Sequence, residues 1–101
     1  MIGTGASWLA AVRPEVRQRV LRYLLASPDI DWITYLYVEY VGPDRLYLVA
    51  AVDMAGDDAE HSLAVRLRRL ERKLEQHEAI EEVVLTLATP NEVSLTPEPT
   101  A

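Results

Sequence analysis

The chain contains no cysteine and no phenylalanine, and only two histidines. Without cysteine it can form no disulfide, no thiolate zinc site and no cysteine nucleophile, so a metal would have to be bound by histidine, carboxylate or water. The longest uncharged run covers residues 1–12, which is too short to span a bilayer and lacks the basic start of a signal peptide. The sequence as given is therefore predicted to be soluble.

Positive charge is also scarce. Ten Lys and Arg residues stand against sixteen Asp and Glu residues, for a formal net charge of −6. Because phosphate contacts require a basic face, we expect no nucleic-acid partner. An acidic surface suits cations better, although a modest negative charge also keeps ordinary domains soluble.

No arrangement of residues typical of catalysis is found in the sequence. Ser27, Ser62 and Ser94 lack the glycine-rich turn of an activated nucleophile, and no phosphate-binding loop is present. The paired acids Glu81 and Glu82 are interpreted as solvated turn residues. We therefore predict that the protein is not an enzyme.

Hydrophobic periodicity divides the chain into alternating helical and strand-like segments. In chain order, the predicted elements are helix 14–26, strand 32–41, strand 45–54, helix 58–77 and strand 83–89. They form one domain over residues 14–91, between a linker over residues 1–13 and a flexible tail over residues 92–101. This order predicts an α+β fold.

The apolar residues of these elements predict where the core lies. The second strand alternates, and its core face is predicted to hold Leu46, Leu48, Ala50, Val52 and Met54. The second helix carries an apolar seam at Leu63, Leu67, Leu70 and Leu74. The first strand alternates poorly, with one face assigned to Thr34, Leu36, Val38 and Tyr40, and the other to Ile33, Tyr35, Tyr37, Glu39 and Val41.

Apolar side chains exceed what so small a domain can bury. They make up 50% of the residues, and a domain of this length hides only about two thirds of the surface of its unfolded chain. We therefore expect a homodimer, with an interface predicted at Tyr35, Tyr37, Tyr47 and Val49. For Trp32 and the tyrosines, including Tyr40, burial in the core is an equally good interpretation.

Several segments resemble the cytoplasmic C-terminal domain of cation diffusion facilitator (cation efflux) transporters. The resemblance covers roughly residues 1–91, and it is carried by IGTGA at 2–6, SPDI at 27–30, VGP at 41–43, LVAAVD at 48–53, LRRLERKL at 67–74 and residues 80–90. It implies an α-β-β-α-β two-layer sandwich of ferredoxin-like or copper-chaperone-like form, with a three-stranded sheet and two helices on one face. It also implies a dimerisation and regulatory domain on the cytoplasmic side of the cell membrane. The domain would be joined to the transmembrane domain of the same transporter if it is cut from a longer chain.

The resemblance fails at the metal ligands. Metal-binding members of the family hold zinc or similar ions near the dimer contact, at positions that correspond here to Thr34, Ala51, Ala64, Leu87 and Thr89. None of these residues is a good ligand for a transition metal. The resemblance therefore implies a regulatory domain of a divalent cation transporter that lacks the usual metal-binding cage.

The histidines leave one other metal site open. His61 has Asp57 and Asp58 within one helical turn, and these three residues form an alternative site for zinc or another divalent cation. The two acids are equally well explained by helix capping, and Asp57 with Glu60 resembles a capping box. His77 is interpreted as a residue at the C-terminal end of the second helix, and no other cofactor is predicted.

Two other functions remain open at this point. The chain is compatible with a free-standing α+β module that senses a small ligand or a metal, and with a soluble adaptor that docks to a transporter. A complete ferredoxin-like fold requires a strand before the first helix, and residues 1–12 make a poor strand.

Overall fold

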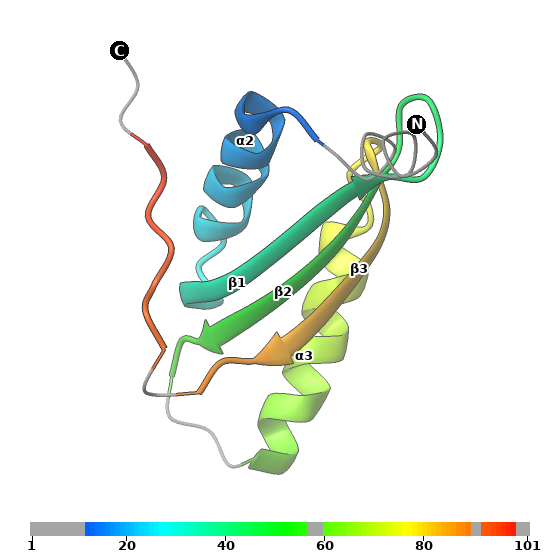
Figure 1. Cartoon of the computed structure of the whole chain (residues 1–101). Coiled ribbons are helices and arrows are strands. Elements are labelled where there is room, and N and C mark those ends of the chain that lie inside the picture. The colour runs from blue at the N-terminus through cyan, green and yellow to red at the C-terminus, as the bar shows by residue number, and fades with distance from the viewer. Residues whose placement is uncertain (1–11, 57–59, 90–91, 99–101) are drawn as a thin grey trace, which may run out of the picture.

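The described residues form two helices and three strands that follow one another in the predicted order (Figure 1). The structure is a computed structural model that describes residues 12–56, 60–89 and 92–98, and only the backbone of residues 60 and 61. Its elements are α2 (Pro14–Leu25), β1 (Ile30–Tyr40), β2 (Leu46–Met54), α3 (Glu60–Leu74) and β3 (Ile80–Leu87). The predicted α+β class and the α-β-β-α-β order are confirmed.

Two predicted element boundaries are wrong in ways that affect side-chain roles. β3 begins at Ile80, so Glu81 and Glu82 belong to a strand and not to a turn. Pairing of Glu82 with Tyr47 of β2 provides the backbone partners that extend the strand. α3 ends at Leu74, so His77 lies in the turn beyond the helix. There the backbone changes to i→i−3 hydrogen bonds, with His77 N–H donating to the Leu74 carbonyl at 3.2 Å.

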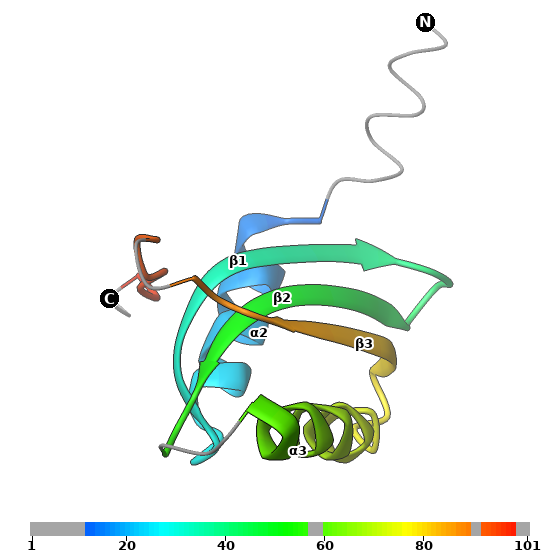
Figure 2. The ribbon, with the colours of Figure 1, turned by 90° about the horizontal axis from the view of Figure 1, so that it is seen from below.

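The sheet is mixed, with strand order β1-β2-β3. β1 and β2 are antiparallel neighbours joined by a short turn, in which Val41 N–H donates to the Arg45 carbonyl at 3.0 Å. β2 and β3 are parallel, so they need the crossover that α3 supplies. Figure 2 shows that α2 and α3 lie on the same side of the sheet. The predicted arrangement of two helices on one sheet face is therefore confirmed.

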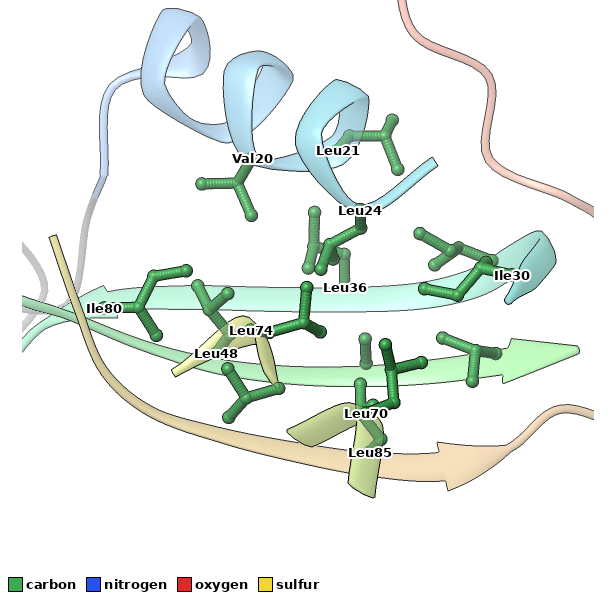
Figure 3. Packing of buried hydrophobic residues seen from close by; sticks show 14 of the residues in the cluster. Val20, Leu21, Leu24, Ile30, Leu36, Leu48, Leu70, Leu74, Ile80 and Leu85 are labelled. Atoms are coloured by element: carbon green, nitrogen blue, oxygen red, sulfur yellow. The ribbon is translucent and has the colours of Figure 1, made fainter. Parts of the chain in front are cut away.

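The core lies between this sheet face and the two helices (Figure 3). The five predicted core residues of β2 are all buried, and Leu48, Ala50 and Val52 are 0% exposed. From α3, Leu67, Leu70 and Leu74 are buried, while Leu63 packs against the cluster from its margin. From α2, Val20, Leu21 and Leu24 complete the apolar contact. Strict alternation in β2 and four-three-four spacing in α3 were thus reliable signals.

The first strand differs from its predicted pattern because its pairing register with β2 shifts twice, between Ile30 and Trp32 and between Ile33 and Tyr35. The second shift leaves Thr34 as the extra residue. An inserted residue moves the side chains on its two sides to opposite alternation, so odd-numbered Ile33 lies on the same core side as even-numbered Leu36 and Val38. The predicted grouping of Ile33 with Tyr35, and of Thr34 with Leu36, is therefore wrong.

The turn between α2 and β1 is tied to α3 by charge. The Asp29 carboxylate lies 3.5 Å from an Arg66 nitrogen and 3.9 Å from Lys73 Nζ. Because these groups are partly exposed, we expect the ion pairs to orient the turn and to add little to the free energy of unfolding.

Among the described residues, no helix has both the length and the apolar character needed to cross a bilayer.

Replacing Leu48 with alanine tests the central position of β2 in the core. Leu48 is 0% exposed, so its truncation removes apolar contacts and leaves a cavity. We expect the free energy of unfolding to fall by about 2–5 kcal/mol, measured by urea denaturation. The control Val93→Ala truncates a residue that is 85% exposed, and its effect is expected to stay below about 0.5 kcal/mol. Similar losses in both variants would contradict the described core.

Candidate functional site

The sheet has a second face that neither α2 nor α3 covers, as Figure 2 shows. We call it the open face. It consists of the odd-numbered residues of β2, whose side chains point away from the helices, and their pairing partners on the neighbouring strands. From β1 come Trp32, Tyr35, Tyr37 and Glu39, from β2 Tyr47, Val49, Ala51 and Asp53, and from β3 Glu82, Val84 and Thr86.

The strand registers arrange most of these side chains in three rows across the sheet. The central row consists of Tyr37, Val49 and Val84. On one side of it lies the acidic row, Glu39, Tyr47 and Glu82, and on the other side the threonine row, Tyr35, Ala51 and Thr86. Successive rows are two residues apart along a strand, or about 7 Å. The open face is therefore apolar in the middle, with two carboxylates in the acidic row and a third, Asp53, beyond the threonine row at the other end.

The four predicted interface residues all lie on the open face. Tyr37 is directly paired with Val49, Tyr35 occupies the next row on one side and Tyr47 the next row on the other. Tyr35 is 51% exposed, and Tyr37, Tyr47 and Val49 are half-buried. Trp32, 42% exposed, lies on the same face opposite Asp53. The structure thus brings the predicted residues into one patch.

The sequence prediction missed Val84 and Thr86, and it left Tyr40 undecided. Val84 and Thr86 join the patch only through the parallel pairing of β3 with β2, which local alternation does not reveal. Tyr40 pairs with Leu46 at the end of the sheet and so belongs to the helix side. It is 41% exposed, so burial in the core is excluded for it.

One hydrogen bond stiffens the open face. The Tyr37 hydroxyl donates to Glu39 Oε1 at 2.6 Å, across two positions of the same strand. This bond, with smaller contributions from desolvation and from the negative charge of Glu39, raises the pKa of Tyr37 above its ordinary value of 10.0. Tyr37 is therefore a neutral donor at physiological pH, and Glu39 keeps further acceptor capacity.

The free edge of β3 is bound by side chains of α3 and of Glu75, the residue that follows it. Val83 N–H donates to Glu75 Oε2 at 2.9 Å, and Leu85 N–H donates to Glu71 Oε2 at 2.7 Å. Arg68 completes the arrangement by donating to the Leu85 carbonyl at 2.8 Å. Unpaired edge groups are the template for adding a foreign strand, and here three of them, in the middle of β3, already have partners. β3 is therefore a poor site for strand addition.

The free edge of β1 is closed by residues 92–98, which were predicted as part of a flexible tail, and by α2. Leu95 N–H donates to the Ile33 carbonyl at 2.7 Å, and Leu95 also packs against the core cluster. From α2, Arg17 donates to the Leu36 carbonyl at 3.3 Å. Two edge carbonyls of β1 are thus occupied within the same chain.

Further hydrogen bonds hold these residues against α2 and β1. Glu98 N–H donates to Gln18 Oε1 at 2.7 Å, and Arg22 donates to the Glu98 carbonyl. Glu92 Oε1 accepts from the Thr34 hydroxyl and from Thr89 N–H, each at 3.1 Å. These donors, with Thr89 first, lower the pKa of Glu92 from its usual 4.5, so the carboxylate is charged at neutral pH.

The positions of the family's metal ligands provide no donor set in this fold. The Thr34 hydroxyl donates a hydrogen bond to Glu92, Ala51 lies on the open face, and Ala64 is an exposed residue of α3. Leu87 ends β3, and Thr89 follows it. Within residues 12–56, 60–89 and 92–98, no group of three or more metal-ligating side chains comes together.

The alternative metal site lies outside the part of the chain whose side chains are described. Asp57 and Asp58 are not among the described residues, and of His61 only the backbone, in the first turn of α3, is described. The same holds for the predicted capping box of Asp57 and Glu60. The metal hypothesis for these residues therefore stays a prediction.

His77 has a structural environment in the turn between α3 and β3. Its Nδ1 accepts a hydrogen bond from Ala79 N–H at 3.1 Å, and its ring meets Tyr23 of α2 edge-on, with centroids 5.2 Å apart. Both residues line a shallow groove of about 540 Å³ between α2 and the end of the hairpin, together with Arg13, Arg19 and Asp44. The histidine thus links the turn to α2.

Removing the carboxylates that close the β3 edge tests their role. In a Glu71→Ala/Glu75→Ala variant, Val83 and Leu85 lose the acceptors of their N–H groups, at a cost of about 1 kcal/mol for each hydrogen bond. We expect faster amide exchange at these two residues and stronger concentration-dependent aggregation than in the parent. The control is Glu78→Ala, which removes an exposed carboxylate with no partner among the described residues. Unchanged exchange in the double variant would contradict the role of the edge bonds.

Comparison of the chain with protein-family models, curated proteins and solved structures finds no match. The resemblance to cation efflux transporters therefore rests on the quoted sequence segments and on the order of the elements.

Proposed function

We propose that this chain is a cytoplasmic dimerisation and regulatory domain of a divalent cation efflux transporter, and that two copies associate through the open face. The observation that carries the dimerisation is the patch of aromatic and aliphatic side chains around Tyr37, Val49 and Val84 on a sheet face without a helix. Such a patch is typical of an interaction surface, because aromatic residues concentrate where interfaces become fully buried.

The other surfaces of the sheet are less suited to association. Its helix side is occupied by the core cluster. The β3 edge is closed by Glu71, Glu75 and Arg68, and the β1 edge by Leu95 and Arg17. Strand addition is therefore disfavoured at both edges, and face-to-face packing of two sheets is the remaining geometry.

The size of the open face sets the expected strength of the dimer. Three strands about 4.8 Å apart give a face about 15 Å wide, and the nine residues of β2 make it about 30 Å long. Its area is therefore about 450 Å², less than the roughly 800 Å² per partner of a standard interface. Net charge of −6 on each copy opposes association further. We therefore expect a dimer that dissociates at concentrations on the order of micromolar. Attachment of each copy to a membrane domain would raise the effective concentration.

The transporter assignment is supported by the sequence resemblance and by the arrangement of the sheet. The chain has the α-β-β-α-β order that the resemblance implies, with a three-stranded mixed sheet. Because the ligand positions hold Thr34, Ala51, Ala64, Leu87 and Thr89, the regulation we propose acts through dimer geometry and not through a zinc cage. A regulatory domain of this kind changes the transporter by favouring one arrangement of two subunits.

The ligand-sensing alternative requires a different sheet in its complete ferredoxin-like form. There the parallel strands of the split β-α-β unit are separated by another strand. Here β2 and β3 are hydrogen-bonded directly, from Leu46 with Ile80 to Val52 with Leu87. This pairing leaves no space for another strand between β2 and β3. The observation favours the shorter regulatory domain.

Placing a charge in the central row tests association through the open face. In Val49→Glu, two carboxylates would face each other in the dimer without a partner. We expect the dissociation constant, measured by analytical ultracentrifugation, to rise at least about tenfold. Circular dichroism of the dilute protein checks that the variant is still folded.

The matched control is Val65→Glu, which introduces the same charge on α3 at a residue that is 47% exposed. This variant is expected to dimerise like the parent. A parent protein that stays monomeric at millimolar concentration would refute the proposed dimerisation. Equal weakening by both variants would instead show that general charge repulsion, and not the open face, controls association.

Zinc titration tests the proposed absence of the family's metal cage. We expect calorimetry to show no saturable, stoichiometric heat for the parent protein, because the ligand positions hold no histidine or carboxylate. The variant His61→Ala should give the same trace. A saturable heat that disappears in His61→Ala would contradict this expectation and establish the alternative site at the start of α3.

A further inference from the structure

We infer that the two copies pack with their strands running in opposite directions, related by a two-fold axis that lies over the central row and crosses the strands. This inference rests on the proposed dimerisation and adds its orientation. It follows from the distribution of charge and side-chain size among the three rows of the open face.

Two symmetric ways of stacking the open faces have to be compared. If the two-fold axis runs along β2, each row meets the same row of the second copy, with β1 above β3. If the axis runs across the strands over the central row, each strand meets its own equivalent. The acidic row then meets the threonine row of the second copy. The central row meets itself in both cases, so the outer rows decide between them.

Charge disfavours the arrangement in which equal rows meet. Glu39 on β1 would then face Glu82 of the second copy on β3, and the symmetry would repeat this contact. Four carboxylates would gather at one end of an interface between two chains that are each negatively charged. Like charges brought together during desolvation oppose association strongly.

The opposite-direction arrangement replaces these repulsions with hydrogen bonds. Glu82 then faces Thr86 of the second copy, whose hydroxyl is a donor. Glu39 faces Tyr35 of the second copy, a phenol that is 51% exposed in the single chain. Glu39 already accepts from Tyr37 through one oxygen, and its other oxygen remains available for this contact.

Side-chain size favours the same arrangement. On β2 the outer rows hold a large residue, Tyr47, and a small one, Ala51. With opposite directions, each Tyr47 packs over the Ala51 of the second copy. With equal rows, tyrosine would meet tyrosine and alanine would meet alanine, which gives overpacking at one end and a void at the other. Charge and size are independent observations, and both favour the same axis.

Cross-linking of single introduced cysteines can determine the position of the two-fold axis, because the chain has no native cysteine that would react as well. Val49→Cys places a thiol in the central row, where it meets its own equivalent in both arrangements. Ala51→Cys places one a single row away, where it meets its equivalent only if equal rows stack. A bismaleimide that spans about 8 Å suits sheets packed about 10 Å apart, and it cannot bridge two Ala51 positions separated by about 14 Å along the strands.

The inference predicts that Val49→Cys cross-links efficiently and that Ala51→Cys does not. Efficient cross-linking of both variants would overturn the inferred axis and leave dimerisation through the open face intact. A dimer in which neither variant cross-links would use another surface, and it would overturn both proposals. A monomer in ultracentrifugation would refute the proposed function itself.

Charge substitutions provide a second test that does not depend on cross-linking. With opposite strand directions, Thr86→Lys places an ammonium against Glu82 of the second copy, twice per dimer. We expect the dimer to tighten about two- to tenfold at low ionic strength, with the gain lost in high salt. Val65→Lys on α3, at a residue that is 47% exposed, changes the net charge by the same amount and should give no such gain. Equal tightening by Val65→Lys, or no tightening by Thr86→Lys, would show that Thr86 does not face Glu82 and would overturn the inference.

Discussion

Packing of both helices on the same side of a three-stranded sheet is the constraint on which the rest of the structure depends. β2 shows its effect most clearly, since its residues alternate between buried and half-buried from Leu46 to Met54. The buried set forms the centre of the core, and the half-buried set forms the middle of the open face. A central strand with apolar residues on both sides gains full burial only when something covers the second face.

The closed edges give this open face its significance. A small sheet exposes two edges as well as a face, and edges are the usual sites of unwanted association. In this protein Glu71 and Glu75 accept from two N–H groups of β3, and Leu95 and Arg17 donate to two carbonyls of β1. In the proposed dimer, these bonds leave the open face as the surface for association.

Some features of the fold were predictable from local sequence, and others required the tertiary structure. The core residues of β2 and the seam of α3 followed from strict periodicity. The patch of Tyr35, Tyr37, Tyr47 and Val49 was predicted from residue type instead, because the first strand alternates poorly. The bulge at Thr34 did not, because a register shift is defined only by the partner strand. The role of Val84 depends on the parallel pairing of β3 with β2. The role of Glu71 depends on how close β3 lies to α3. In sequence, Glu71 is indistinguishable from a solvated helix residue.

The most direct test of the account is to observe contacts between two copies in solution. A mixed sample of isotope-labelled and unlabelled protein, studied by filtered nuclear Overhauser spectroscopy, reports only contacts between chains. The account predicts contacts among Tyr37, Val49 and Val84 of the two copies that disappear on dilution. Contacts that instead involve the outer surfaces of α2 or α3, with none from the open face, would contradict it.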